Sequence, residues 1–357
     1  MIETHVVNAL LDTSMREGPL YAVLSFINGL VAPSFLFCAG FALSIVLRRR
    51  WEKFITLQTP LWRYIVRLLF ILIVGYSLHL PYFSYTRMRD LSDLQSWSSF
   101  FQVDILQVIA VTLVALVLVA LVTRKRGALT VMATSMAAIV VLVAPLVRNG
   151  NYSNLAIWLR PFLTTKVNSQ FPLFPWSAFL IFGTVVGSWF LSANESGNAR
   201  PWILRLVQLS IMTISAALLF EFSPITIYTE HDFWGPSPQF FFLRLGLVTL
   251  LLASFWWYTE LKHPSAKSLL TIFGQESLLV YVAHLLIVYG QDYDWSLLRQ
   301  FGPNLGYIHC LGIFASLTIA MSILAFCWRW MKAWNKSVAN TVQYIVLGGM
   351  VFRFFTS

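Results

Sequence analysis

Apolar stretches almost free of charged residues recur along the chain from Tyr21 to beyond Trp328. Each is about 20 residues long, the length that an α-helix needs to cross a hydrocarbon core of about 30 Å. Polar and basic residues gather in the short connections between the stretches. The pattern therefore predicts an all-α fold, a polytopic transmembrane helical bundle of about nine to ten helices.

The limits of the expected helices follow from the stretches that are long enough to span a bilayer. These are Tyr21–Leu47, Leu61–Leu80, Val103–Val122, Ala128–Val147, Leu173–Leu191, Trp202–Phe220, Phe240–Tyr258, Leu269–Gly290 and His309–Trp328. A further stretch, Val342–Phe352, is short and interrupted by glycine, so it either lies at the interface or crosses with help from its neighbours. No internal repeat divides the chain, which predicts one integral-membrane domain over residues 1–357.

Composition excludes several functional classes. Apolar residues make up 58% of the chain and charged residues 11%, and the mean hydropathy is +0.70, which excludes an ordinary soluble domain. The three cysteines show no CxxC or Cys/His spacing, and no two histidines lie four residues apart, so we expect neither a disulfide framework nor a metal site. The motifs of serine hydrolases, P-loop ATPases and dinucleotide-binding folds are absent.

The net charge of +10 reflects basic residues placed at the ends of alternate spans rather than a nucleic-acid site. The basic connections contain Arg48, Arg49, Arg50 and Lys53; Arg124, Lys125 and Arg126; Arg200 and Arg205; Lys262 and Lys267; and Arg329, Lys332 and Lys336. The intervening connections contain Asp90, Asp93, Glu221, Glu230, Asp232, Asp292 and Asp294. The positive-inside rule assigns the basic connections to the cytoplasm. By the same alternation, residues 1–20 begin on the extracytoplasmic side.

The first residues, MIETHVVNALLD, look like the outer end of a helix without its cytoplasmic part. They contain no charged n-region and no cleavage site of a signal peptide. We expect either a first helix that is truncated at its N-terminus or a short extracytoplasmic tail. His5 lies in this segment.

Polar side chains inside the spans indicate candidate sites, because ionisable groups in hydrocarbon usually face a cavity or the bundle interior. Arg63 and Arg67 share a helix face near the cytoplasmic end of the second span, where they would suit a phosphate-bearing ligand or serve as interfacial anchors. Asp104 and Gln107 share a face at the outer entrance of the third span. They would bind a sugar-like acceptor or complement the helix dipole. Arg244 would pair with the acidic connection 230–232.

The eighth span carries a polar stripe formed by Ser277, Tyr281 and His284. Such a stripe lines a cavity or makes hydrogen bonds between neighbouring helices. Glu276, one residue from the stripe, would be either a proton-relay or cofactor-lining group, or a carboxylate that snorkels to the interface.

Six phrases spread over nearly the whole chain carry a resemblance to a known family. They are MIETH, FINGLVAPSFLFCAGFALSI, VDILQVIAV, FPLFPWSAFLIFGTVVG, WGPSPQFFFLRLG and FGQESLLVYVAHLLI. Their order and spacing resemble the bacterial membrane family related to heparan-alpha-glucosaminide N-acetyltransferase, within the wider group of membrane acyltransferases that modify sugars.

The resemblance implies that acetyl-CoA or a similar acyl-CoA enters from the cytosol and that the acyl group reaches an acceptor on the other side. It also implies a reactive histidine at the outer end of the first helix, and MIETH places His5 there. In relatives this helix begins with an Arg-Gly dipeptide, which here would fall before Met1. We therefore expect either an upstream start or the loss of most of the first helix.

Together these features predict an integral-membrane acyltransferase, multi-pass in the cytoplasmic membrane, that acetylates a glycan or glycolipid at the extracytoplasmic side. His5 would act as general base or as a transiently acylated nucleophile. The expected donor-phosphate residues are Arg48, Arg49, Arg63 and Arg67. The expected acceptor-side residues are Asn28, Asp104, Gln107, Tyr281 and His284.

The expected partners are the lipid bilayer and the acceptor, and we expect neither nucleic acid nor a metal. The sequence leaves open whether the protein forms a homo-oligomer. Two other functional classes would fit the same sequence features. One is a transporter or flippase of a lipid-linked saccharide, and the other is a non-catalytic scaffold. Consumption of acyl-CoA separates the acyltransferase from both.

Overall fold

A computed structural model describes residues 1–80, 83–91, 96–167, 169–224, 227–228, 232–263, 268–290 and 295–356. Over these residues the chain is helical, without a β-sheet, and nine helical segments are long and apolar enough to cross a membrane. A bent pair of helices would supply a tenth crossing. The predicted all-α, multi-pass architecture is confirmed.

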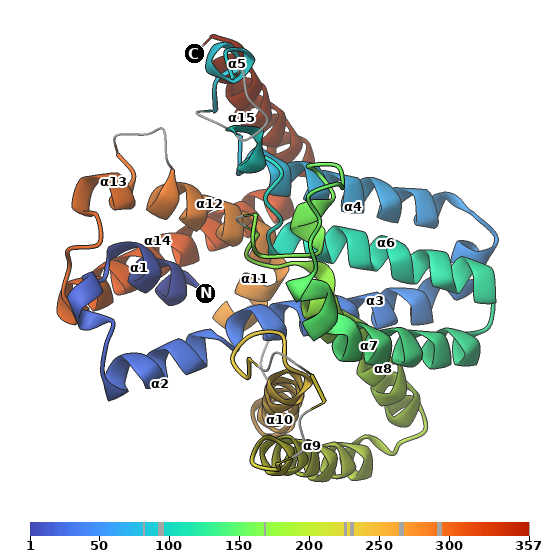
Figure 1. Cartoon of the computed structure of the whole chain (residues 1–357). Coiled ribbons are helices and arrows are strands. Elements are labelled where there is room, and N and C mark those ends of the chain that lie inside the picture. Colours follow the sequence, from blue (N-terminus) through green and yellow to red (C-terminus); the bar gives the residue numbers. More distant parts are fainter. Residues whose placement is uncertain are drawn as a thin grey trace. The chain divides into compact units, whose positions relative to one another are not determined.

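The chain folds into two compact units. Unit 1 consists of Met1–Gly29, Leu80–Asp93 and Leu261–Ser357, and unit 2 consists of Leu30–His79 and Leu94–Glu260. Figure 1 labels the helices of both units.

Unit 2 contains the longer run of expected spans. Its elements are α3 (Val31–Ile55), α4 (Thr59–Ser77), η3 (Ser96–Ser98), α6 (Ile105–Thr123), α7 (Arg126–Asn149), η4 (Arg160–Phe162), α8 (Leu173–Glu195), α9 (Ala199–Glu221) and α10 (Pro238–Lys262). Helices α3 and α7 both pack against α8, and α4 packs against α6 (Figure 1).

Glycines bring α3 and α8 into close contact. A Cβ atom at Gly183 would lie 2.1 Å from the Phe37 carbonyl oxygen, and one at Gly40 would lie 1.8 Å from the Leu180 carbonyl oxygen. The Thr184 hydroxyl donates a hydrogen bond to the Gly40 carbonyl oxygen at 3.0 Å. Small residues at this helix crossing permit backbone approach, which is how membrane helices gain packing energy without a hydrophobic driving force.

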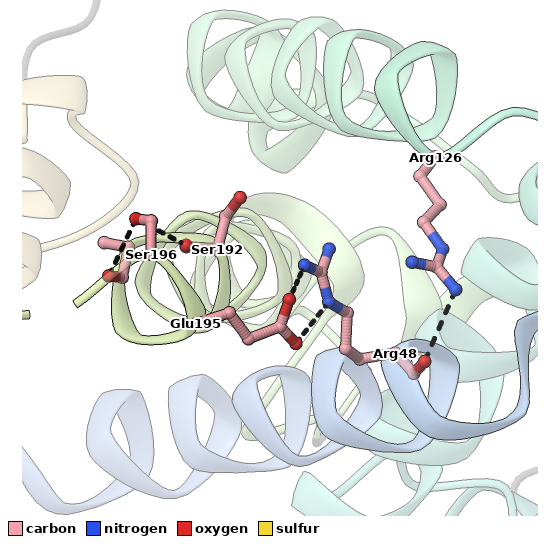
Figure 2. A network of polar contacts seen from close by, with 6 residues as sticks. Arg48, Arg126, Ser192, Glu195 and Ser196 are labelled. Atoms are coloured by element: carbon pink, nitrogen blue, oxygen red, sulfur yellow. Dashed lines mark hydrogen bonds and ion pairs between the residues drawn. The ribbon is translucent and has the colours of Figure 1, made fainter. Parts of the chain in front are cut away.

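Basic connections of unit 2 meet at one end of the bundle, as the charge alternation requires. Figure 2 shows Arg48, at the C-terminal end of α3, donating from Nε to Glu195 at the end of α8, at 2.8 Å. Arg126, at the start of α7, donates to the Arg48 carbonyl oxygen at 3.4 Å. These three helix ends therefore share one side. His79, after α4, and Asp104, before α6, lie 2.8 Å apart and join two helix ends that the alternation assigns to the other side.

Unit 1 is assembled from both ends of the sequence. Its elements are α1 (Ile2–Leu10), η1 (Thr13–Met15), α2 (Pro19–Asn28), α5 (Tyr85–Arg89), α11 (Leu269–Gln275), α12 (Ser277–Tyr289), α13 (Leu297–Phe301), α14 (Tyr307–Trp334) and α15 (Lys336–Thr356). Helix α1 packs against α12, α13 and α14 (Figure 1).

The N-terminal residues form a packed helix rather than a tail. Val6 and Leu10, one turn apart on α1, are fully buried. The Asp12 amide donates to the Leu305 carbonyl oxygen at 2.9 Å. Arg16 donates to the carbonyl oxygens of Asn8 at 3.1 Å and Leu11 at 2.8 Å, which satisfies acceptors at the open end of the helix.

Three expected spans differ in detail from the structure. The expected helix Tyr21–Leu47 is interrupted after Asn28, and the expected helix Leu269–Gly290 is bent by 82° between α11 and α12. The Glu276 carboxylate, at this bend, pairs with Lys332 on α14. The stretch Val342–Phe352 belongs to the longer helix α15, which is a candidate span of 21 residues.

Candidate active site

His5 lies on α1 beside an aromatic and imidazole cluster on α12. Its ring centroid is 5.2 Å from that of His284, 6.4 Å from that of Tyr281 and 5.6 Å from that of Tyr289. The Tyr289 hydroxyl donates to the His5 carbonyl oxygen at 3.2 Å. The structure thus brings together His5, Tyr281 and His284, which the sequence indicated separately, and adds Tyr289, which sequence reasoning missed.

Packing of apolar side chains fixes the position of His5. Val6 and Leu10 of α1 belong to one hydrophobic core with Val280 and Val288 of α12 and Leu317 of α14. Since side chains on a helix project in fixed directions, burial of that stripe orients the neighbouring His5. His5 is partly exposed.

His284 has a defined hydrogen-bonding role within the cluster. Its ring is fully buried, and Nδ1 lies 2.6 Å from the Val280 carbonyl oxygen. Because a carbonyl oxygen only accepts, Nδ1 carries the proton in the neutral ring, and Nε2 is left as an acceptor. Among the described residues Nε2 has no hydrogen-bond partner. A buried acceptor left unpaired in this way is rare in folded proteins.

Asn28 also lies close to α1 within unit 1. Its Nδ2 atom donates to Glu3 Oε1 at 3.3 Å. Glu3 stands two positions before His5 on the same helix. Asn28 therefore helps to hold the end of α2 against the helix that carries His5.

Asp104 and Gln107 belong to unit 2, where they cap α6. The Asp104 amide donates to Gln107 Oε1 at 3.2 Å, and Gln107 Nε2 donates to the Gln102 carbonyl oxygen at 3.3 Å. Asp104 Oδ2 lies 2.8 Å from His79 Nε2. Asp104 Oδ1 is buried and has no hydrogen-bond partner in the part of the chain that the structure describes. One acceptor at this cap is thus left for another group.

The expected donor arginines of unit 2 differ in their surroundings. Arg48 is already paired with Glu195, so a phosphate would have to compete with this carboxylate. Arg49, Arg63 and Arg67 are exposed. Arg63 and Arg67 lie one turn apart on α4, and neither forms a salt bridge with any residue that the structure describes.

Some charged residues of the predicted connections lie outside the described residues. These are Asp93, Glu230, Lys267, Asp292 and Asp294. Among the described residues, no three histidine, cysteine, aspartate or glutamate side chains are grouped as metal ligands would be.

Comparison with known proteins identifies the family. No curated protein and no solved structure matches the chain. The family model described as heparan-alpha-glucosaminide N-acetyltransferase, catalytic, matches residues 1–215, which include α1 with His5 and the candidate spans through most of α9. Since this match covers more than half of the chain, the protein belongs to the heparan-alpha-glucosaminide N-acetyltransferase catalytic family, a family of multi-pass membrane acetyltransferases.

Proposed function

We propose that this protein transfers an acetyl group from acetyl-CoA in the cytosol to a glycan or glycolipid acceptor on the extracytoplasmic side of the cytoplasmic membrane. The observation that carries the proposal is the placement of His5. It lies on a packed helix within the family match, 5.2 Å from the buried ring of His284, measured between centroids. We further propose that His5 is the catalytic residue.

The chemistry requires a base at the acceptor. A hydroxyl or amine of the acceptor attacks the thioester carbonyl carbon, and His5 takes the proton that the acceptor loses. When the carbon–sulfur bond breaks, the imidazolium returns this proton to the leaving thiolate. In the alternative course the imidazole attacks the thioester carbonyl carbon, and the carbon–sulfur bond breaks and releases the CoA thiolate. The acetyl group stays on His5 until the acceptor hydroxyl or amine attacks it, which frees the imidazole, and the proton that the acceptor loses passes to the thiolate or to water.

His284 and Tyr281 would orient the acceptor beside His5. His284 Nε2 is a buried acceptor without a protein partner among the described residues, so a substrate hydroxyl or amine can donate to it. A bond of this kind fixes the acceptor before proton transfer, which raises the rate by positioning. Asn28 acts indirectly, through its bond to Glu3. Asp104 and Gln107 remain proposed acceptor-side residues, for which the unpartnered Asp104 Oδ1 is the support.

Arg63 and Arg67 are the best-supported candidates for the phosphates of the donor. They are exposed, one turn apart, and without a salt bridge to any described residue, so their charge is available to a ligand. Charge-assisted contacts between arginine and phosphate are the strong class of hydrogen bond in proteins. Arg48 and Arg49 would add to the positive field at the adjoining end of α3. Acetyl-CoA supplies the activated acyl group when bound.

The decisive experiment compares His5→Ala with His309→Ala, a control that removes an exposed histidine from α14 of the same unit. Both full-length variants are assayed in liposomes with labelled acetyl-CoA and an extract of glycan acceptors. Loss of a general base should lower transfer by about 10²–10⁴-fold in the His5 variant, while the control keeps wild-type activity.

Isotope exchange between acetyl-CoA and labelled CoA, measured without acceptor, separates the two roles of His5, because such exchange requires a covalent acetyl-enzyme. Exchange that wild type catalyses and His5→Ala does not identifies the nucleophile, whereas no exchange by wild type identifies the base. Equal transfer by His5→Ala and wild type would refute the proposal. Movement of a lipid-linked saccharide without use of acetyl-CoA would instead identify a transporter.

A further inference from the structure

Two neighbouring cavities of unit 2 share the side chain of Arg148. The larger cavity, about 260 Å³, is lined by Lys166 and Asp232 among others. The smaller cavity, about 140 Å³, is lined by Trp176 and Arg244 among others. Two of the phrases singled out in the sequence, FPLFPWSAFLIFGTVVG and WGPSPQFFFLRLG, supply the aromatic wall of the smaller cavity.

Among the described residues, no group accepts a hydrogen bond from the guanidinium of Arg244. It lies partly buried on α10, within a candidate membrane span. Its guanidinium carbon is 3.7 Å from the centroid of the Phe240 ring and 5.6 Å from that of Trp176. The expected pairing with Asp232 is not formed, and Glu230 lies outside the described residues.

Within the described part of the chain, Arg244 makes no hydrogen bond or ion pair. Five N–H donors left without acceptors in partly buried surroundings are costly. Stacking on a ring occupies only the flat face of the guanidinium. The N–H groups in its plane keep the fork geometry that matches a phosphate or carboxylate.

The surrounding charges favour an anion. Arg148 donates to the Thr165 hydroxyl at 3.2 Å, and the Lys166 ammonium donates to the Asn149 carbonyl oxygen at 3.2 Å. These bonds hold two further cations at the cavity walls but neutralise neither. Among the described residues that line the two cavities, three are cations and Asp232 is the one carboxylate, which is an excess of positive charge.

The size of the cavities limits the ligand. Sites for drug-sized molecules measure roughly 300–1,000 Å³, and neither cavity reaches that range. A nucleotide with a pantetheine arm, as in CoA, is therefore too large. Trp176 and Phe240 offer apolar surface to a ring that accompanies the anionic group.

We propose that these cavities bind a small ligand that carries a phosphate or carboxylate group on a sugar-sized ring, held by Arg244 and Arg148. The inference rests on unit 2 alone and goes beyond the proposed acetyl transfer. The anionic group is carried either by a soluble saccharide or by the head group of a lipid, and the two sources are separable by experiment.

Binding is measured on the full chain in phosphatidylcholine nanodiscs, without acetyl-CoA, so that failure of the acetyltransferase assay cannot affect the result. The probes are glucose 6-phosphate, glucuronate and, as the neutral control, glucose. Arg244→Gln removes the guanidinium and its paired N–H donors. Arg205→Gln removes an exposed arginine of α9 that lines neither cavity, and it is the matched control.

We expect at least one anionic probe to bind wild type and Arg205→Gln equally, about 10–100-fold more weakly to Arg244→Gln, and glucose to bind to none of them. Without ligand, the melting temperature of Arg244→Gln should stay close to that of wild type, because removal of the unpaired donors offsets the lost stacking on Phe240 and Trp176. A purely structural arginine would give a lower melting temperature instead.

The same proteins in phosphatidylglycerol nanodiscs test the lipid source. Stabilisation by this lipid that requires Arg244, without binding of the soluble probes, assigns the site to a lipid head group. The proposal is overturned if every soluble probe binds equally to wild type and Arg244→Gln and phosphatidylglycerol stabilises the two proteins equally.

Discussion

At the residue scale, His284 combines complete burial with a nitrogen that has no partner among the described residues. In His284→Phe a ring of similar size keeps the core filled, while the bond to the Val280 carbonyl oxygen and the free acceptor are both lost. The lost bond should lower the free energy of unfolding by only about 0.5–1.5 kcal/mol. Acetyl transfer should fall by about 10–100-fold, since a substrate donor loses its buried acceptor.

Transfer rates with labelled acetyl-CoA and a thermal melt of the same preparation check this expectation. Tyr307→Phe is the control, because it removes a hydrogen bond to a backbone carbonyl oxygen, that of Met15, from the same unit but outside the cluster. If His284→Phe is as active as wild type, the His284 ring serves packing alone.

The sequence predicts that two residues lie together only where they are close along the chain. Tyr281 and His284 were predicted as one face of a helix, and Asp104 and Gln107 stand at the spacing of a capping box. No local pattern could place His5 beside Tyr289, 284 residues away. Such contacts depend on which apolar faces pack together, and this information is absent from any single segment.

At the scale of elements, the approach of α3 and α8 depends on residues without a side chain. Gly183→Ala would place a methyl group 2.1 Å from the Phe37 carbonyl oxygen, which is backbone and cannot rotate away. The helices must then separate, and we expect a loss of about 1–3 kcal/mol in the free energy of unfolding.

Gly127→Ala on α7 is the matched control, since nothing lies within 4 Å of its added Cβ atom. It should be neutral or stabilising by up to about 1 kcal/mol. Thermal or denaturant unfolding in detergent measures both variants. Equal stability of the two would mean that the α3–α8 crossing relaxes at no cost.

The bend between α11 and α12 has a charge pair beside it. Glu276 is 7% exposed and Lys332 is 41% exposed, so Lys332→Met leaves a buried carboxylate without its partner. We expect a loss of about 1–3 kcal/mol in the free energy of unfolding. The double variant Glu276→Gln with Lys332→Met should recover most of this loss, because no charge is then left unpaired.

Lys336→Met, which removes an exposed lysine at the start of α15, is the control and should be nearly neutral. Unfolding of the three variants and wild type in detergent gives the comparison. A double variant no more stable than Lys332→Met would show that the pair does not account for the cost.

Hydropathy predicted where most spans lie, because the length of an apolar stretch is a property of the sequence itself. It did not predict the bend at Glu276, although Gly274, Gln275 and Glu276 interrupt the apolar pattern there. Hydropathy also did not clearly predict α15 as a span, because two adjacent glycines interrupt its apolar stretch. A helix interior tolerates glycine at a cost of about 1 kcal/mol, which neighbouring residues can offset.

At the scale of the whole molecule, alternating charge determines which helix ends share a side. Arg48, Arg126 and Glu195 meet at one end of unit 2, which requires α3, α7 and α8 to cross in alternating directions. A reporter inserted after Gly197 should therefore indicate the same side as one after Arg50, and a reporter after Gly150 the opposite side. We expect the Arg50 side to be the cytoplasm.

Aromatic contacts within unit 1 indicate that α15 also crosses the membrane. Its first residue follows α14, whose C-terminal end carries Arg329 and Lys332 and is assigned to the cytoplasm. Near its other end, Phe354 lies 5.9 Å from Phe83 and 6.1 Å from Tyr85, measured between ring centroids. The chain reaches Phe83 shortly after α4, whose C-terminal end the charge alternation assigns to the extracytoplasmic side, so we expect the two ends of α15 on opposite sides.

We therefore predict that a reporter fused after Thr356 indicates the extracytoplasmic side, whereas one inserted at Asn335, between α14 and α15, indicates the cytoplasm. Paired alkaline phosphatase and green fluorescent protein fusions make the comparison, because each is active on only one side. The fusion after Arg50 is the cytoplasmic control, and that after Gly150 is the extracytoplasmic control. If the fusions at Asn335 and after Thr356 indicate the same side, α15 does not cross the membrane and instead lies along the interface. Its contacts with Phe83 and Tyr85 would then form without a crossing.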